Sequence, residues 1–329
     1  MRVLVTGGAG YIGSHTAKAL AIAGHEPVVL DDLRTGYAEN VRWGPLIEAS
    51  LDDAAALRTL LSTHAIEAVA HFAASAYVGE SMRRPEAYFR NNVGGTLSLL
   101  EAMLAAGVGT IVFSSSCATY GVPDVTPITE STSQHPVNPY GESKLIVERM
   151  LRWMGEIHGL RWLALRYFNA AGADPDGELG EAHNPETHLV PLAVGAALGG
   201  PRLHVFGDDY PTPDGTPIRD YVHVSDLADA HVAALRELES GRATSGGLNL
   251  GTGRGHSVRE VIAAVERAAG RPVRYQVDAR RQGDAPVLVA DPSLSQTVLG
   301  WQPRFTGLGA IVETAVAWAA PRLKASPID

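Results

Sequence analysis

Short apolar runs alternate with helical stretches along the first half of the chain. Runs of this length, rich in β-branched and aliphatic residues, are typical of strands buried on both faces of a parallel sheet. We expect six such strands, at Arg2–Val5, Pro27–Leu30, Pro45–Ala49, Ala65–Phe72, Thr110–Ser114 and Leu163–Tyr167.

Helices are expected between these strands. Ile12, Thr16 and Leu20 lie on one helical face that Gly24 ends, and Asp52 or Asp53 can cap a helix through Leu57, Leu60 and Leu61. A long helix is predicted from about Pro85 to Ala106, and Asn138-Pro139 opens another, since proline is tolerated at the first helical position. The alternation predicts a doubly wound, Rossmann-like α/β fold with a parallel sheet covered on both faces.

The regular alternation of predicted strands and helices ends after Gly172. Glycine, proline and aspartate gather at 172–180 and 210–217, and we expect loops there, over a ligand or between lobes. Regular helices return at Ser257, where Glu260 completes a capping box, and around 308–315. We predict a nucleotide-binding domain over 1–171, to which 219–252 returns, and a second, smaller α/β substrate lobe over 172–329.

Composition narrows the class of protein. The chain has 329 residues, of which 45% are hydrophobic and 19% charged, which excludes a disordered or coiled-coil chain. Acidic residues outnumber basic ones by 36 to 27, so we expect neither nucleic acid nor a membrane surface as partner. No apolar run could span a bilayer, the N-terminus has no cleavable signal layout, and the single cysteine, Cys117, excludes an internal disulfide. We therefore expect a cytoplasmic protein.

A glycine-rich motif, Gly7-Gly8-Ala9-Gly10-Tyr11-Ile12-Gly13, follows the first strand and opens the first helix. Glycines at this spacing let the backbone turn sharply and approach a pyrophosphate at a helix N-terminus. Asp31 and Asp32 end the second strand, where an acidic residue can bind the adenosine ribose. A carboxylate there repels a 2′-phosphate, so the pattern favours NAD over NADP, with Arg34 the one feature that points the other way.

A second motif, Tyr140-Gly141-Glu142-Ser143-Lys144, places a phenol and an ammonium on one helical face. A free tyrosine is a poor base at neutral pH, and a nearby cation favours the phenolate. Such a phenolate could accept a proton from a sugar hydroxyl. Ser114-Ser115-Ser116 ends the fifth strand upstream, where a serine could hydrogen-bond the same hydroxyl.

These motifs, with several longer segments, resemble the extended short-chain dehydrogenases/reductases and, among them, the UDP-glucose 4-epimerases (UDP-galactose 4-epimerases). The resemblance runs nearly end to end. It rests on TGGAGYIGSH, LDDL, HFAASAYVGES, NNVGGT, SSSCATYG, NPYGESK, LRYFNAAGA, VFGDDYPTPDGTPIRDYVHVSDLADAH and RRQGDAP. The glycine motif and the tyrosine-lysine pair indicate only the superfamily, whereas the last three segments are specific to the epimerases.

The resemblance implies an NAD-dependent isomerase that interconverts UDP-glucose and UDP-galactose through a 4-keto intermediate. It implies catalysis by Ser116, Tyr140 and Lys144. The positions that match NAD contacts are Gly7, Gly10, Tyr11, Ile12, Gly13, Asp31, Asp32, Leu33, Arg34, Thr35, Gly36, Ser50, Leu51, Phe72, Ala73, Ala74, Ala76, Asn91, Ser114, Tyr140, Lys144, Tyr167 and Phe168. Those that match the UDP-sugar site are Ser116, Tyr140, Asn169, His188, Leu189, His204, Phe206, Arg219, Arg281, Asp284 and Leu288.

Five positions depart from the family pattern. Ser50 stands where an acid often contacts adenine, and Ala76 stands where many members have lysine. His188 replaces an asparagine, and His204 stands where a small residue often touches uracil. Leu288 occupies a position that is tyrosine in some members, and the smaller side chain leaves room for an N-acetyl sugar, so UDP-GlcNAc and UDP-GalNAc are also expected substrates.

Parts of this pattern also occur in proteins with other functions. A 4,6-dehydratase needs an acid and a base where this chain has Cys117-Ala118, so elimination is disfavoured. A UDP-glucuronate or UDP-xylose 4-epimerase and a non-catalytic NAD-binding sensor remain alternatives. The spacing of His183 and His188 fits neither a helical i, i+4 pair nor a zinc finger, so no metal is expected. The expected partners are the UDP-sugar and a second copy of the chain in a homodimer.

Overall fold

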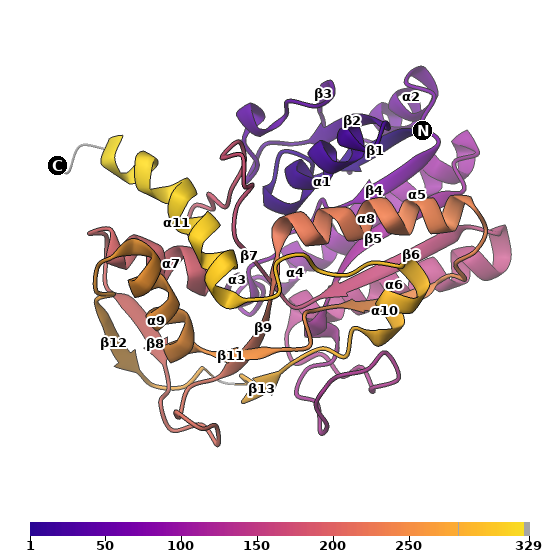
Figure 1. Ribbon diagram of the computed structural model, residues 1–329. Coiled ribbons are helices and arrows are strands. Elements are labelled where there is room, and N and C mark those ends of the chain that lie inside the picture. The colour runs from indigo at the N-terminus through magenta and orange to yellow at the C-terminus, as the bar shows by residue number, and fades with distance from the viewer. Residues whose placement is uncertain (282, 326–329) are drawn as a thin grey trace.

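The structure, a computed structural model, describes residues 1–281 and 283–325. Its larger part is a seven-stranded sheet in the order β10-β6-β5-β4-β1-β2-β3, in which every pair is parallel (Figure 1). The strands are β1 (Arg2–Thr6), β2 (Glu26–Asp31), β3 (Leu46–Glu48), β4 (Ala68–His71), β5 (Thr110–Ser116), β6 (Arg161–Tyr167) and β10 (Gly246–Leu250). The predicted parallel, doubly wound sheet is thus confirmed.

Helices cover both faces of this sheet, as Figure 1 shows. On one face lie α1 (Tyr11–Ile22), α8 (Val224–Glu239) and α10 (Ser293–Leu299), which bury Leu20, Leu235 and Leu299 with Val3 and Val5 of β1. On the other lie α2 (Ala54–Thr63), α5 (Gly95–Ala106) and α6 (Pro139–His158). Because successive strand residues face opposite sides, Leu4 joins this second core, and apolar residues fill both positions of each strand.

The residues predicted to cap or end helices do so in the structure. Asp53 caps α2 by accepting from the backbone N–H groups of Ala55 and Ala56, and Asn138 caps α6 by accepting from Gly141. Gly107 takes a left-handed conformation that ends α5, a position where residues with a Cβ would be strained.

Several boundaries differ from the prediction. The strand expected at Ala65–Phe72 is only β4, because Ala65 adopts a positive φ of 46° just before it. The long helix contains α4 (Pro85–Tyr88), a π-helical turn η2 (Phe89–Gly94) and α5. Short helices α3 (Val78–Ser81), η1 (Ala38–Asn40) and η3 (Cys117–Thr119) were not predicted.

A smaller α/β lobe follows β6. Its strand β9 (Ile218–His223) pairs in parallel with β7 (Asn169–Ala171) and β13 (Val287–Leu288) and antiparallel with β11 (Gly255–Ser257), while β8 (Leu203–Phe206) pairs with β12 (Tyr275–Asp278). Helices α7 (Leu189–Ala197), α9 (Val258–Ala269) and α11 (Leu308–Ala325) pack together in one core. Ser257 and Glu260 form the predicted capping box of α9.

The stretch 219–252 is shared between the two sheets. Its first strand, β9, belongs to the smaller lobe, whereas α8 and β10 complete the larger one. None of the helices within 1–281 and 283–325 is long and apolar enough to cross a membrane.

Candidate functional site

The glycine motif forms a tight turn between β1 and α1. Gly7 has a positive φ of 69°, and a Cβ there would lie 2.6 Å from the backbone nitrogen of Ala73. A Cβ on Gly13 would lie 2.3 Å from the carbonyl oxygen of Gly7. Only glycine allows these approaches, so the turn brings the N-terminus of α1 against the ends of β1 and β4. This is the cradle that a dinucleotide pyrophosphate requires.

Asp31 anchors this turn to the end of β2. Its carboxylate accepts from the backbone N–H groups of Ala9 and Leu33, both at 2.9 Å. Burial raises the pKa of Asp31, and these two hydrogen bonds oppose that rise. Gly36 packs so close that a Cβ would lie 3.1 Å from the Asp31 carboxylate.

The Arg34 side chain bonds neighbours other than this carboxylate. Its Nε bonds Asp32 at 2.6 Å and its Nη2 bonds the side-chain oxygen of Asn91 at 2.6 Å. Arg34 is the residue that favoured NADP in the sequence analysis. In the structure its guanidinium already bonds the side chains of Asp32 and Asn91. The other expected adenosine contacts lie around this end of the sheet: Thr35 follows β2, and Ser50 and Leu51 follow β3.

The loop after β4 carries the next expected contacts, Phe72, Ala73, Ala74 and Ala76. Asn92, a residue that the sequence analysis missed, fixes this loop by accepting from Ser75 N at 2.8 Å and donating to Ser75 O at 3.0 Å. The same amide donates to Ser143 Oγ on α6, which ties the loop to the helix of Tyr140 and Lys144. The sequence feature that could have identified Asn92 is the polar pair that it forms with Asn91 inside an otherwise apolar helix.

The three expected catalytic residues meet where β5 ends against α6. Ser116 is the last residue of β5, and Tyr140 and Lys144 lie one turn apart on α6. The Lys144 Nζ donates to the carbonyl oxygen of Ser114 at 2.7 Å and lies 5.8 Å from the centre of the Tyr140 ring. The Ser114 hydroxyl bonds the hydroxyl of Tyr167. The structure thus brings the residues of both motifs together.

Burial dominates the protonation of this pair. Desolvation raises the pKa of Tyr140 to about 12, and a hydrogen bond with Ser116 acts against this rise. Desolvation also lowers the pKa of Lys144 to about 7, although the Glu148 carboxylate opposes that fall. Between about pH 7 and pH 12, burial therefore favours the neutral phenol of Tyr140 and the neutral amine of Lys144. Positive charge added near the phenol would favour its ionised form.

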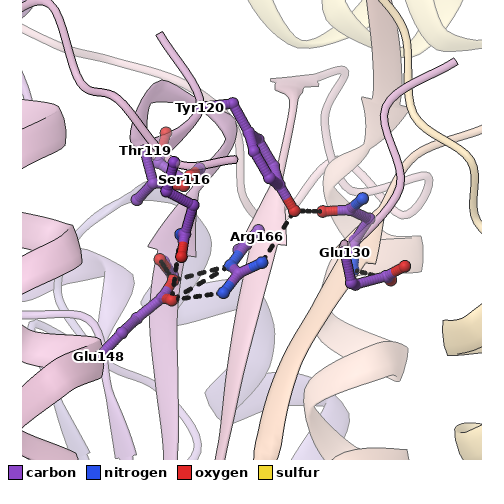
Figure 2. A network of polar contacts seen from close by, with 9 residues as sticks. Ser116, Thr119, Tyr120, Glu130, Glu148 and Arg166 are labelled. Atoms are coloured by element: carbon purple, nitrogen blue, oxygen red, sulfur yellow. Dashed lines mark hydrogen bonds and ion pairs between the residues drawn. The ribbon is translucent and has the colours of Figure 1, made fainter. Parts of the chain in front are cut away.

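A buried polar row lies under the end of β5 (Figure 2). Ser115, Arg166 and Asn249 are cross-strand neighbours on β5, β6 and β10. Glu148 of α6 accepts from Ser115 Oγ at 2.5 Å and from Arg166 Nη2 at 2.6 Å. The row continues from Arg166 to the Tyr120 hydroxyl at 2.8 Å, which donates to Asn249 at 2.7 Å. The row connects the helix of Tyr140 and Lys144 to three strands of the sheet.

The smaller lobe brings together the residues expected to bind the UDP-sugar. Arg219 of β9 pairs in register with Leu288 of β13 and donates to Asp284. The Arg281 guanidinium lies 3.9 Å from the centre of the Phe206 ring. Arg219 and Arg281 are permanently charged, and each is positioned by a neighbouring side chain of the same lobe. Two such cations can bind a diphosphate.

Asp220 is a second residue that the sequence analysis missed. It is fully buried beside Arg219 and accepts from the backbone N–H groups of Thr252, Gly253 and Ala290. These bonds join β9 to the segment that carries Leu288. The sequence signal was an acid that directly follows Arg219 in the middle of a strand.

The remaining expected contacts lie on elements of both lobes. The Tyr11 hydroxyl donates to the carbonyl of Gly172 at 2.6 Å, and Asn169 pairs with Tyr221. His188 directly precedes α7, which Leu189 begins, and its side chain makes no capping hydrogen bond. Ile12 is partly buried in α1, and Phe168, buried after β6, packs near Cys117. His204 is about half exposed and lies 2.5 Å from Asp278, so its side chain faces outward along the β8–β12 pair.

Comparison with known proteins agrees with this geometry. A model of the "NAD dependent epimerase/dehydratase family" matches residues 3–251. A UDP-glucose 4-epimerase of Rhizobium meliloti is 51% identical over 97% of each chain. The crystal structure of UDP-glucose 4-epimerase from Brucella ovis in complex with NAD has a TM-score of 0.94 and 53% identity, covering 97% of this chain and 98% of that one.

A more distant structure, UDP-glucose 4-epimerase from Bifidobacterium longum in complex with NAD+ and UDP, has a TM-score of 0.93 and 36% identity, with 98% and 99% coverage. The match is therefore close in sequence and in fold over almost the whole length. The chain belongs to the NAD dependent epimerase/dehydratase family, within its UDP-glucose 4-epimerases.

Proposed function

We propose that this chain is an NAD-dependent epimerase that interconverts UDP-glucose and UDP-galactose. The observation that carries the proposal is the meeting of Ser116, Tyr140 and Lys144 at the carboxyl end of β5, the edge of the parallel sheet at which the glycine turn also follows β1. Ligands of parallel α/β folds bind at this end of the sheet. The relatives named as UDP-glucose 4-epimerases support the same activity.

Each residue has a distinct part in the proposed reaction. Bound NAD supplies a hydride acceptor and the positive ring that favours the phenolate of Tyr140. Tyr140 takes the proton of the sugar 4-hydroxyl, Ser116 hydrogen-bonds the same oxygen, and the C4 hydrogen leaves as hydride. The resulting 4-keto sugar rotates in the site while Arg219 and Arg281 hold the diphosphate. The hydride then returns to the opposite face of the sugar C4. Tyr140 then gives back the proton, so the net redox change is zero.

The activity is tested by incubating purified protein with UDP-galactose and separating the products by chromatography. Appearance of UDP-glucose, with NAD(H) as the nucleotide extracted from the protein, is expected. Conversion of UDP-glucuronate or UDP-xylose alone would favour the alternative epimerases. Bound NAD without turnover of any UDP-sugar would favour a sensor.

We further propose that N-acetylated UDP-sugars are accepted. Leu288 lies in register with Arg219, so its side chain belongs to the strand that borders the expected diphosphate site. A leucine occupies less of the pocket than a tyrosine, and a hydrophobic wall rejects extra bulk by overlap. The Leu288→Tyr variant should lose UDP-GalNAc turnover far more than UDP-galactose turnover. Equal loss of both activities would mean that Leu288 does not border the C2 substituent.

A cytoplasmic homodimer is also proposed. The single thiol, Cys117, supports a reducing compartment. Large apolar side chains are exposed on α5 and α6, on the same side of the sheet: Leu97, Leu104, Trp153 and Ile157. Exposed apolar patches of this kind mark interfaces. Light scattering should give twice the chain mass for the wild type and a smaller mass for Trp153→Glu, and a monomeric wild type would contradict the proposal.

A further inference from the structure

Four metal-binding side chains converge in the loop between Gly180 and α7. Glu181, His183, Glu186 and His188 each offer one ligand atom, and these atoms lie within 4.8 Å of one another. The spacing did not predict a site because it fits no helical pair or finger. A folded loop has no such requirement, since its turns can bring all four side chains to one point.

The separations between these atoms are near those of tetrahedral coordination, and the shortest of them are hydrogen-bond lengths, as between Glu181 and His183. Oε1 of Glu181 lies 3.0 Å from Nδ1 of His183 and 2.6 Å from Nδ1 of His188. Oxygens of Glu186 lie 3.8 Å and 3.3 Å from the same two nitrogens. Ligands at about 2.0–2.1 Å from a tetrahedral zinc ion are about 3.3 Å apart. The four nitrogen–oxygen distances bracket this value, and imidazole with carboxylate is a donor set that zinc accepts.

A second cluster in the same region holds a lysine, whereas the histidines are the only cationic side chains that the structure pairs with Glu181 and Glu186 in its described residues. Asp174, Asp176 and Glu178 also converge, but the Lys18 Nζ lies 2.6 to 2.9 Å from all three and supplies their cation. Among the described residues, no lysine or arginine forms an ion pair with Glu181 or Glu186.

His188 adds a second observation that points to a ligand. Its Nδ1 atom is buried and forms no hydrogen bond within the described part of the chain, although it lies against the Glu181 carboxylate. The close approach therefore lacks hydrogen-bond geometry. A metal ion bound by both groups would draw a lone pair from each and would move the two atoms apart, from 2.6 Å to about 3.3 Å.

The position of the loop indicates what such an ion would hold. Gly180, Ala182 and His183 line one cleft together with Gly10 and Tyr11 of the glycine turn. The His183 ring also packs edge-on against Tyr11 and Tyr77, at 6.2 and 5.9 Å between centres. The cluster thus lies directly beside the expected dinucleotide cradle.

We propose that Glu181, His183, Glu186 and His188 bind one zinc ion, which fixes the 180–188 loop over the glycine turn and slows release of the bound dinucleotide. Metal binding is inferred from the cluster alone, and only the effect on dinucleotide release rests on the proposed function.

Untagged protein, expressed with added zinc and desalted, is analysed by mass spectrometry for metals. We expect about one zinc per chain in the wild type, as for a closed four-ligand site, and a loss of most of it in His183→Ala and His188→Ala. The matched control is His256→Ala, which changes a histidine beside Glu260 outside the cluster. After chelation, adding zinc should raise the melting temperature and slow NAD loss on dialysis in the wild type and the control only.

Either of two results would overturn the proposed metal binding. The first is wild-type protein that contains no zinc and shows no change in melting temperature when zinc chloride is added. The second is full zinc content in the double variant His183→Ala/His188→Ala, which would place the metal elsewhere. Zinc binding without any effect on NAD loss would overturn the proposed role of the loop. Turnover of UDP-galactose is measured separately, so failure of the proposed activity is distinguished from failure of the metal site.

Discussion

The buried Glu148–Arg166 pair offers a sharp test of how the catalytic helix is held. The side chains of Glu148 and Arg166 are 5% and 8% exposed, and the carboxylate accepts from both Nε and Nη2 of the arginine. The change Glu148→Gln removes the negative charge and leaves the guanidinium buried. Breaking a buried pair from one side costs about 3–5 kcal/mol, and glutamine keeps one acceptor, so we expect about 3 kcal/mol.

The size of the thermal shift follows from chain length. Unfolding entropy of about 2.1 cal/mol/K per residue gives about 0.7 kcal/mol/K for this chain, so a loss of about 3 kcal/mol lowers the melting temperature by about 4 °C. The matched control is Glu26→Gln, because the side chains of Glu26 and its partner Arg2 are 72% and 49% exposed. A surface pair contributes little, so the control should shift by less than about 1 °C. Calorimetry on both variants and the wild type measures the difference.

The same variant tests whether the row positions the catalytic residues. Glu148 holds Ser115, whose neighbours Ser114 and Ser116 contact Lys144 and Tyr140. Because misplacement of a catalytic group by 1 Å can lower the rate on the order of 10²-fold, we expect kcat to fall at least about tenfold while KM changes little. In the double variant Glu148→Gln/Arg166→Met no charge is left unpaired, so stability should partly recover. A thermal shift no larger than the control, or an unchanged kcat, would refute the reasoning.

The remaining predictions concern single groups of the site. Tyr140→Phe removes the proposed base, so kcat should fall on the order of 10²–10⁴-fold with NAD content unchanged, and near-normal turnover would exclude that role. Lys144→Ala removes a group whose pKa is lowered to about 7, so wild-type activity that depends on its ammonium should decline as pH rises through about 7. In the variant that decline should vanish and the pH optimum should rise. Burial raises the pKa of Tyr140 to about 12, and the variant has no cation at position 144 to lower it. An unchanged pH–kcat profile would contradict this. Nucleotide extracted from the wild type should be NAD(H), and Asp31→Ala should lower its amount; NADP(H) as the main species would mean that Arg34 governs the choice.

Local patterns in the sequence determined much of the nucleotide-binding half. The glycine turn, the Asn138 cap of α6 and the Ser257 capping box each depend on residues a few positions apart, so their geometry is already specified in the chain. The same holds for Tyr140 and Lys144, because one helical turn places them on one face. The family resemblance then predicted which distant segments complete the site, and the match over residues 3–251 confirmed the family.

Only the tertiary structure decided the features that depend on distant pairing. The register that aligns Ser115, Arg166 and Asn249 across three strands brings together residues more than a hundred positions apart, and no local periodicity specifies it. The seventh strand, β10, was not predicted as a strand, although 219–252 was expected to return to the first domain. Glycine-rich residues carry a weak strand signal until a neighbouring strand supplies hydrogen bonds. The convergence of Glu181 and His188 depends in the same way on the path of a loop, which backbone packing sets and side-chain spacing does not.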